Sequence, residues 1–149
     1  MSESEPWRTF RRSYATCLDR LRDESRERYV AAIGPALAGF VVLNLKGAFV
    51  GYVQSICVAP ERRGRGVGTS LLRFAEERIF REAPNVFICV SDFNDGARRL
   101  YERLGYRLVG ELADFIVRGH SELLLRKTRG PLSEFQPLPL PGLPGRGAG

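Results

Sequence analysis

Apolar and polar residues follow one rhythm at the start of the chain and another after about residue 25. Between residues 8 and 24, apolar side chains recur every three or four positions with charges between them, a spacing that predicts one amphipathic helix. Further along, short apolar runs rich in Val, Ile, Phe and Tyr predict three strands, at 29–33, 37–45 and 49–58. The short links between these runs contain Gly and predict an antiparallel meander.

The middle of the chain has a helical pattern followed by another strand-like run. An amphipathic stretch covers about residues 69–81, and an apolar run at 86–90 predicts the next strand. A strand, a helix and a strand in this order form a crossover, so the strand at 86–90 should lie parallel to the strand at 49–58.

A second helix and two further strands complete the pattern. Asn94 or Asp95 can cap the start of this helix, and Gly105 can end it. The runs at 106–111 and 122–126 predict the last two strands.

Length and composition indicate one domain with a tail. The 149 residues suffice for a domain with its own core, which we place at residues 1–130. Residues 137–149 contain eight Pro or Gly residues in thirteen positions and cannot form a packed element. Residues 131–149 are therefore expected to form a disordered tail.

The formal net charge is +6, but Asp and Glu are interspersed among most of the arginines, so nucleic acid is not favoured as a partner. Three cysteines without paired spacing and a single histidine indicate neither a disulfide framework nor a metal site. We expect no metal, and a reducing cytoplasm fits this cysteine usage best.

The uncharged stretch from residue 29 to 45 is marginal in length for a membrane span. Gly34-Pro35 interrupts it, and β-branched and aromatic residues are frequent in it, so buried strands explain it better. The short acidic start of the chain also lacks the features of a signal peptide. We therefore expect no membrane partner.

The most informative segment lies between the strand at 49–58 and the helix at 69–81, and it reads Arg62-Arg63-Gly64-Arg65-Gly66-Val67-Gly68. Glycines leave the main chain open to a ligand, and the unpaired amides at the start of a helix attract an anion. Arg63 and Arg65 add full positive charge. The segment therefore predicts a phosphate site.

Two common phosphate motifs do not fit, because a dinucleotide fingerprint needs Gly where Thr69 stands and a Walker A loop needs Lys where Gly68 stands. The segment instead resembles the acetyl-coenzyme A pyrophosphate loop of the GNAT superfamily of N-acetyltransferases. The family pattern is Gln or Arg, two residues, Gly, one residue, then Gly or Ala. Arg63, Gly66 and Gly68 match it. An ordinary Gly-rich turn on a basic surface is the alternative.

A second block strengthens the resemblance. Asn94, Ala97 and Tyr101, closed by Leu104-Gly105-Tyr106, look like the family pattern of Asn, Ala and Tyr followed by Leu-Gly-Phe or Leu-Gly-Tyr. Together with the order of strands and helices, the two blocks extend the resemblance over about residues 29–127.

The resemblance implies an α/β fold of the α+β kind: a mixed, mostly antiparallel sheet whose central parallel strands splay apart, with helices on both faces. The family usually begins with a strand before its first helix, and Met1 to Pro6 is too short and polar to supply one. A single helix also stands where the family has a pair that forms one wall of the acceptor site. Acceptor specificity is therefore the feature that transfers least.

The resemblance also implies where acetyl-coenzyme A binds. The pyrophosphate would lie on the loop and helix start, and the pantetheine arm would pair with unpartnered backbone of the strand at 49–58. Asn94 would contact this arm, or would only cap its helix. The cofactor-binding residues expected on this basis are Ile56, Cys57, Val58, Arg63, Gly64, Arg65, Gly66, Val67, Gly68, Thr69, Asn94 and Tyr101.

Three residues are candidates for catalysis. Tyr101 resembles the family's proton donor to the departing thiolate, and a core tyrosine is the alternative. Tyr52 resembles a tyrosine of certain peptide amino-terminal acetyltransferases and equally fits a core aromatic. His120, which follows the loop expected at 113–121, could act as a base or be a surface turn residue.

The predicted function is N-acetyl transfer from acetyl-coenzyme A to a primary amine by direct attack in a ternary complex. Because no carboxylate stands on the strand at 49–58, we expect a peptide or protein α-amine as acceptor rather than a lysine side chain. A polyamine or antibiotic acceptor, another acyl group and a non-catalytic coenzyme A binding module are the alternatives. The sequence leaves the oligomeric state open, a homodimer included.

Overall fold

The computed structural model describes residues 5–138, which fold around one sheet of six strands. The strands are β1 (Glu27–Ile33), β2 (Ala36–Asn44), β3 (Tyr52–Val58), β4 (Asn85–Ser91), β5 (Arg107–Ala113) and β6 (Ser121–Thr128). The helices are α1 (Tyr14–Arg22), α2 (Val67–Ile79) and α3 (Asp95–Arg103), and short 3-10 turns lie at Pro60–Arg62 and Leu132–Glu134. Each predicted helix and strand has a counterpart, and most of them differ from the prediction at one or both ends.

The sheet is mixed. Its strand order is β1-β2-β3-β4-β6-β5, and every neighbouring pair is antiparallel except β3 and β4. The predicted meander is formed by β1, β2 and β3, and the parallel pair is joined by α2, as the crossover rule requires. The predicted α/β fold with a mostly antiparallel sheet is therefore confirmed. Within the described residues, no strand precedes α1.

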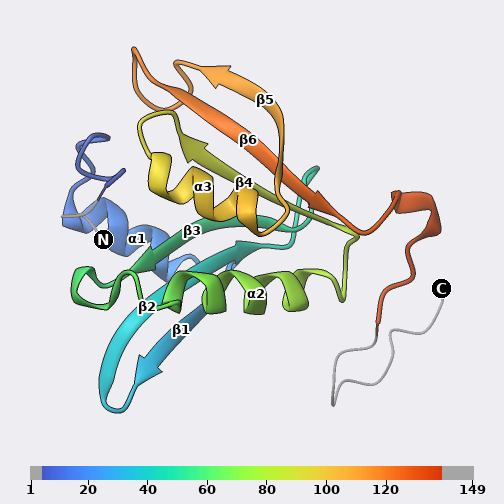
Figure 1. Ribbon diagram of the computed structural model, residues 1–149, viewed down its shortest axis with the longest axis horizontal. Helices are drawn as coiled ribbons and strands as arrows, with labels where there is room; N and C mark the ends of the chain where they lie inside the picture. The colour runs from blue at the N-terminus through green and yellow to red at the C-terminus, as the bar shows by residue number, and fades with distance from the viewer. Residues whose placement is uncertain (1–4, 139–149) are drawn as a thin grey trace.

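Helices cover both faces of the sheet. Figure 1 shows α2 and α3 on the near face and α1 behind the sheet. The apolar positions of α2 recur at helical spacing and form the centre of the core, because they are buried against the sheet. The largest buried side chains of this layer are Leu72 and Ile79 from α2, with Val41, Leu43, Val53, Val86, Ile88 and Leu125 from the strands.

The helix predicted for residues 8–24 is wrong at its start. It begins only at Tyr14, because Ser13 is extended and its side chain accepts a hydrogen bond from an amide in the first turn of α1. Just before this cap, Arg11 has a φ of 50°, which no continuous right-handed helix contains. Trp7 therefore belongs to a separate turn segment, where it is 8% exposed.

The strand predicted for residues 49–58 is also shorter than expected. It begins at Tyr52, because Gly51 has a φ of 93° and its backbone closes directly onto the start of β4. The amide of Phe87 donates a hydrogen bond to the Gly51 carbonyl oxygen over 2.9 Å, and a Cβ at this glycine would collide with the Asn85 carbonyl. This contact brings the beginnings of β3 and β4 together.

The predicted limits of α3 are confirmed. The Asn94 side-chain oxygen accepts a hydrogen bond from the Ala97 amide over 3.3 Å, and Gly105 has a φ of 95° just past the helix end.

The domain division is not resolved by the described residues. β6 ends at Thr128 and is followed by a short turn at Leu132–Glu134, whereas residues 139–149 of the predicted tail lie outside the described range. Among residues 5–138, the structure contains no helix with the length and apolar character of a membrane span. The same residues contain no group of three or more metal-ligating side chains.

Candidate functional site

β3 and β4 are paired at one end and separate at the other. Their parallel register covers two residue pairs, and the last of these joins Val53 to Ile88. A bulge at Gln54 follows, since Val53 and Ser55 face consecutive residues of β2 and skip Gln54. Beyond this bulge, residues 54–58 of β3 have no strand partner on the β4 side. The splayed parallel pair is therefore confirmed, and it exposes backbone groups along β3.

The separated strands open into a cavity of about 760 Å³, which we call the loop cavity because the Arg62–Gly68 segment forms one wall. Eleven of the twelve predicted cofactor-binding residues line it, and Arg65 does not. The eleven are Ile56, Cys57, Val58, Arg63, Gly64, Gly66, Val67, Gly68, Thr69, Asn94 and Tyr101.

The loop presents its backbone to this cavity. Gly64 and Gly66 have φ values of 70° and 82°, a conformation that strains any residue with a Cβ although the surrounding space is open. Within residues 5–138, no protein group accepts a hydrogen bond from the amides of residues 64–69, and the first bond into α2 runs from Ser70. Successive unpaired amides at a helix start attract negative charge. These residues therefore fit the diphosphate of coenzyme A.

The arginines of the loop have different positions. The Arg63 Nε donates a hydrogen bond to the Val58 carbonyl oxygen over 3.4 Å, so this arginine holds the loop against the end of β3. Arg62 lines the loop cavity although it was not predicted to do so, whereas Arg65 is exposed outside it.

Further residues of the loop cavity were missed by the sequence analysis. Leu100 and Arg103 line it from α3, and Trp7 and Arg8 line it from the turn segment before α1. The spacing of Leu100 and Arg103, three residues apart and therefore on one helix face, was a usable signal. No local signal placed Trp7 there, because its spacing matched a helix stripe.

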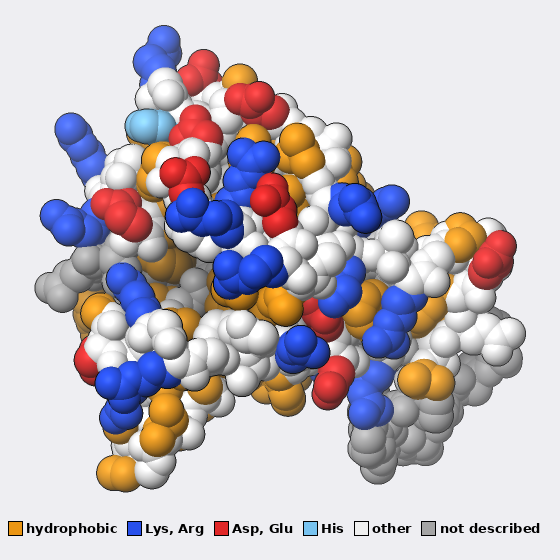
Figure 2. Space-filling view, viewed as in Figure 1, with side chains coloured by type: hydrophobic (Ala, Val, Ile, Leu, Met, Phe, Trp, Pro, Cys, Tyr) orange, Lys and Arg blue, Asp and Glu red, His pale blue; other side chains and the backbone are white. Residues whose placement is uncertain are grey.

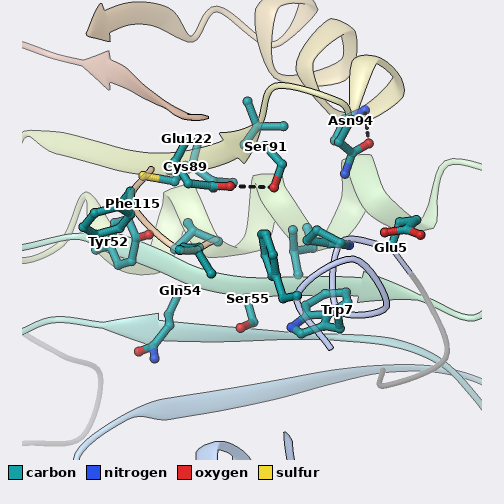
Figure 3. Close-up of a pocket in the computed structure, with 18 of the residues that line it drawn as sticks. Glu5, Trp7, Tyr52, Gln54, Ser55, Cys89, Ser91, Asn94, Phe115 and Glu122 are labelled. Carbon is teal, nitrogen blue, oxygen red and sulfur yellow. Dashed lines mark hydrogen bonds between the residues drawn. The ribbon is translucent and has the colours of Figure 1, made fainter. Parts of the chain in front are cut away.

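A second cavity, of about 540 Å³, extends from the split strands toward α1 and the segment before β6. We call it the Glu122 cavity. Figure 3 shows Glu122, Cys89, Tyr52 and Phe115 toward one end of it, and Trp7, Glu5 and Asn94 toward the other. Its charged side chains are Glu5, Arg12, Arg20, Arg26 and Glu122.

Glu122 is the buried acidic group of this cavity, whereas Glu5 is exposed. Glu122 is 5% exposed, lies on β6 and faces Ser91 of β4 in the strand register. The Ser91 hydroxyl donates a 2.6 Å hydrogen bond to one carboxylate oxygen, and no protein donor within residues 5–138 engages the other. Burial raises the pKa of Glu122 above its usual value, the Ser91 bond opposes this, and the charge of Asp92 adds to it. Glu122 was not among the predicted catalytic residues.

Tyr52 lines the Glu122 cavity, as a residue near the acceptor should. Burial is the main cause that raises its pKa, and the neighbouring Cys89 and Glu122 raise it further. The phenol therefore keeps its proton at neutral pH and can donate a hydrogen bond, but it is a poor source of a phenolate base.

The two cavities meet at Tyr101. This residue is 5% exposed, and it lines both cavities together with Ile56, Asn94 and Ala97. Burial alone raises its pKa, and within the described part of the chain no hydrogen bond to its hydroxyl contributes. Tyr101 therefore presents a protonated hydroxyl where a ligand of one cavity would touch a ligand of the other.

His120 lies apart from this junction. It lines neither cavity, and its Nδ1 is 3.2 Å from an Asp92 carboxylate oxygen on the surface. The ring also packs edge to face against Phe93. Of the three predicted catalytic residues, the fold brings Tyr101 and Tyr52 to the cavities and leaves His120 outside them.

Positive charge on the outer surface is diffuse. Figure 2 shows Lys and Arg side chains over the face that carries α2 and α3, with Asp and Glu side chains among them. Some of these opposite charges pair directly, as in the ion pairs Arg78–Glu82 and Arg98–Glu102. The positive charge of this face is therefore partly neutralised.

Comparison with known proteins agrees with this architecture. The sequence matches the acetyltransferase (GNAT) family over residues 2–106. It is 34% identical over 110 residues to an uncharacterized N-acetyltransferase of Methanocaldococcus jannaschii, with 70% of each chain covered. Nourseothricin acetyltransferase has a similar structure, with a TM-score of 0.64, 30% identity, and coverage of 71% of this chain and 66% of that one. A GNAT family acetyltransferase from Elizabethkingia anophelis with acetyl-coenzyme A bound has a TM-score of 0.67 at 20% identity, covering 78% and 83% of the two chains. This chain therefore belongs to the GNAT family of acetyltransferases.

Proposed function

We propose that this enzyme acetylates an α-amine, or another amine of low pKa, and takes the acetyl group from acetyl-coenzyme A. The observation that carries the proposal is the meeting of two cavities at Tyr101. One cavity offers unpaired amides to a diphosphate, and the other offers a buried carboxylate to an amine. Two substrates can therefore approach one point from opposite sides, which suits direct transfer in a ternary complex.

The loop cavity suits the donor. Acetyl-coenzyme A supplies a thioester carbonyl that the amine attacks. The amides of residues 64–69 would hold its diphosphate, and the unpartnered backbone of Ile56 to Val58 would pair with the amides of its pantetheine arm. A main-chain N–H of the same β3 segment would stabilise the charge that develops on the carbonyl oxygen.

Tyr101 would donate a proton or a hydrogen bond to the departing sulfur. Its raised pKa keeps the hydroxyl protonated, and its lack of a protein partner in the described residues leaves it available. Neither Cys57 nor Cys89 is needed as a nucleophile, because the amine attacks directly. Burial raises the pKa of both thiols, which disfavours the reactive thiolate.

Glu122 would receive the amine. Its free carboxylate oxygen can accept a hydrogen bond from an ammonium group and then its proton, while the Ser91 hydroxyl fixes the other oxygen. This carboxylate comes from β6 and not from β3, where the sequence contains none. It replaces His120 as the candidate base, since His120 lines neither cavity.

The amine class follows from proton energetics. At pH 7, freeing a lysine amine costs about 4.6 kcal/mol and freeing an α-amine costs about 1.1 kcal/mol. The difference of about 3.5 kcal/mol does not depend on the pKa of the base that takes the proton. A buried carboxylate, which is a much weaker base than either amine, therefore serves an α-amine better than a lysine side chain.

The test uses two matched peptides, one with a free α-amine and no lysine, the other with a blocked α-amine and one lysine. Thiol release from acetyl-coenzyme A gives kcat/KM for each. We expect the free α-amine to be preferred by about tenfold or more. A higher kcat/KM on the blocked, lysine-bearing peptide would assign the acceptor as a lysine side chain instead. No thiol release with any amine would rule out the proposed acetyl transfer.

A further inference from the structure

We infer that the acceptor carries an anionic group besides its amine, and that Arg12 and Arg20 bind this group inside the Glu122 cavity. The inference rests on the proposed function, because it assigns the amine to the Glu122 end of the same cavity. The shared chemistry is a carboxylate close to an α-amine, as in a free amino acid or in a peptide with an acidic residue near its amino terminus.

The first observation is a group of three arginines in this one cavity. Arg12 precedes α1, Arg20 lies on it and Arg26 follows it, and all three line the cavity, with Arg20 exposed at its rim and the other two half-buried. Arg26 is neutralised, because its Nε is 3.3 Å from an Asp23 carboxylate oxygen. Within residues 5–138, neither Arg12 nor Arg20 has a carboxylate within ion-pair distance.

The two acids of the cavity do not pair with these arginines. Glu122 is bonded to the Ser91 hydroxyl, and Glu5 accepts a 2.7 Å hydrogen bond from the Thr9 hydroxyl. Positive charge at the α1 end of the cavity is therefore left without an acidic protein partner in the described residues.

An anion would stabilise this arrangement. Partial burial lowers the pKa of Arg20, and the like charge of Arg12 lowers it further, so the two cations are close enough to repel each other. A carboxylate bound between two guanidinium groups replaces that repulsion with attraction, and the planar fork of each arginine matches its two oxygens.

The cationic end and the amine end belong to the same cavity. Arg20, Tyr52 and Glu122 all line it, and the charges of Arg20 and Glu122 both affect the pKa of Tyr52. A cavity of about 540 Å³ suits a small molecule or the first residues of a peptide. The anion and the amine of one acceptor can therefore both lie in this cavity, and a polyamine is disfavoured because it would bring further positive charge to Arg12 and Arg20.

The experiment compares acceptors that differ only in this anion. Alanine and alaninamide differ in the carboxylate of a free amino acid. Ala-Asp-Ala-amide and Ala-Asn-Ala-amide differ in an acidic side chain near a peptide terminus. Spermidine represents the polyamines. The inference expects the anionic member of at least one pair to have the higher kcat/KM by about tenfold, and the pair that shows it identifies the source of the anion.

The variants are Arg12→Gln and Arg20→Gln, with Arg22→Gln as the matched control. Arg22 is exposed on the same helix and lines neither cavity. We expect Arg20→Gln to remove most of the preference by raising KM for the anionic acceptor. The rate on the neutral member of the pair and the affinity for coenzyme A should stay near those of the wild type, as both should in Arg22→Gln.

A binding measurement separates this inference from the proposed function. Calorimetric titration with N-acetylalanine and N-acetylalaninamide, and with the N-acetylated Asp and Asn peptides, needs no turnover. Tighter binding of an anionic member that is lost in Arg20→Gln supports the anion site even if no amine is acetylated. Equal binding and equal kcat/KM within both pairs would overturn the inference while leaving N-acetylation intact.

Discussion

The two cavities of this protein are built in opposite ways. The loop cavity takes most of its lining from one continuous segment of chain, and its central groups are backbone amides. The Glu122 cavity takes its lining from the turn segment before α1, from α1 and α3, from four strands and from the segment before β6, and its central groups are side chains. The first can be identified from consecutive residues, whereas the second exists only after folding.

This difference in construction matches what each cavity binds: the donor in the loop cavity and the acceptor in the Glu122 cavity. A diphosphate is the same in every donor of this class, and backbone amides can bind it with few demands on side chains beyond glycine. An acceptor differs from enzyme to enzyme, so its cavity depends on side chains that can change without disturbing the loop. Mutations in the two cavities should therefore have separable effects on donor binding and on acceptor chemistry.

The largest effect is expected in the loop cavity. Gly66→Glu places a Cβ at a φ of 82° and a negative charge beside the amides of residues 64–69. Coenzyme A affinity should fall by about 100-fold or more, measured by calorimetry. The control is Gly34→Glu, which has a similar φ of 59°, open surroundings and no place in either cavity. Normal affinity in Gly66→Glu would show that the diphosphate does not bind here.

The second largest effect is expected at Tyr101, where the two cavities meet. Tyr101→Phe removes only the hydroxyl of this residue, which lines both cavities, so kcat should fall by about 100-fold with little change in coenzyme A affinity. Tyr106→Phe is the control, because Tyr106 packs 6.0 Å away, centroid to centroid, and lines neither cavity. If both variants keep wild-type turnover, the proton reaches sulfur from another group.

A smaller effect is expected for Glu122→Gln. About one α-amine in seven is already free at pH 7, so losing the base should cost only about tenfold in kcat/KM. In the wild type, kcat/KM should rise with pH as this carboxyl loses its proton, above its usual pKa of 4.5, and Glu122→Gln should lack that rise. Ser91→Ala should move the rise to higher pH, because the bond that favours the carboxylate is gone.

The same pKa has a consequence for stability. Because the pKa of Glu122 is raised in the folded protein, the stabilisation from its protonated form is present at low pH and is lost as pH rises through that pKa. The melting temperature of Glu122→Gln relative to the wild type should therefore be higher at pH 7 than at pH 4. An unchanged difference would show that this carboxyl titrates normally.

The smallest effect is expected for Asn94, which also lines both cavities. Asn94→Ala should lower the free energy of unfolding by about 1 kcal/mol, because it removes the cap of α3. Asn94→Asp keeps the cap, and denaturant titration should show wild-type stability. Reduced coenzyme A affinity in Asn94→Asp would show that the amide also contacts the donor, and normal affinity would leave the residue a cap alone.

Several features of the fold could be predicted because they depend on short stretches of chain. The crossover from β3 through α2 to β4 follows from one apolar run, one glycine-rich loop and one helical stripe. Asn94 and Gly105 mark the ends of α3 through local backbone preferences. The prediction failed for Trp7, because helical spacing of apolar residues does not reveal that the helix starts only after Ser13.

The sequence by itself therefore determined the parts that local physics governs: the order of the elements, and a loop whose glycines and helix start suit a diphosphate. Only the tertiary structure decided the acceptor side. Glu122 meets Ser91 because β6 pairs with β4 across 31 residues of chain, and Arg20 and Tyr52 line one cavity because α1 packs behind the sheet. Contacts between distant segments depend on strand register and helix packing, which no short stretch of residues encodes.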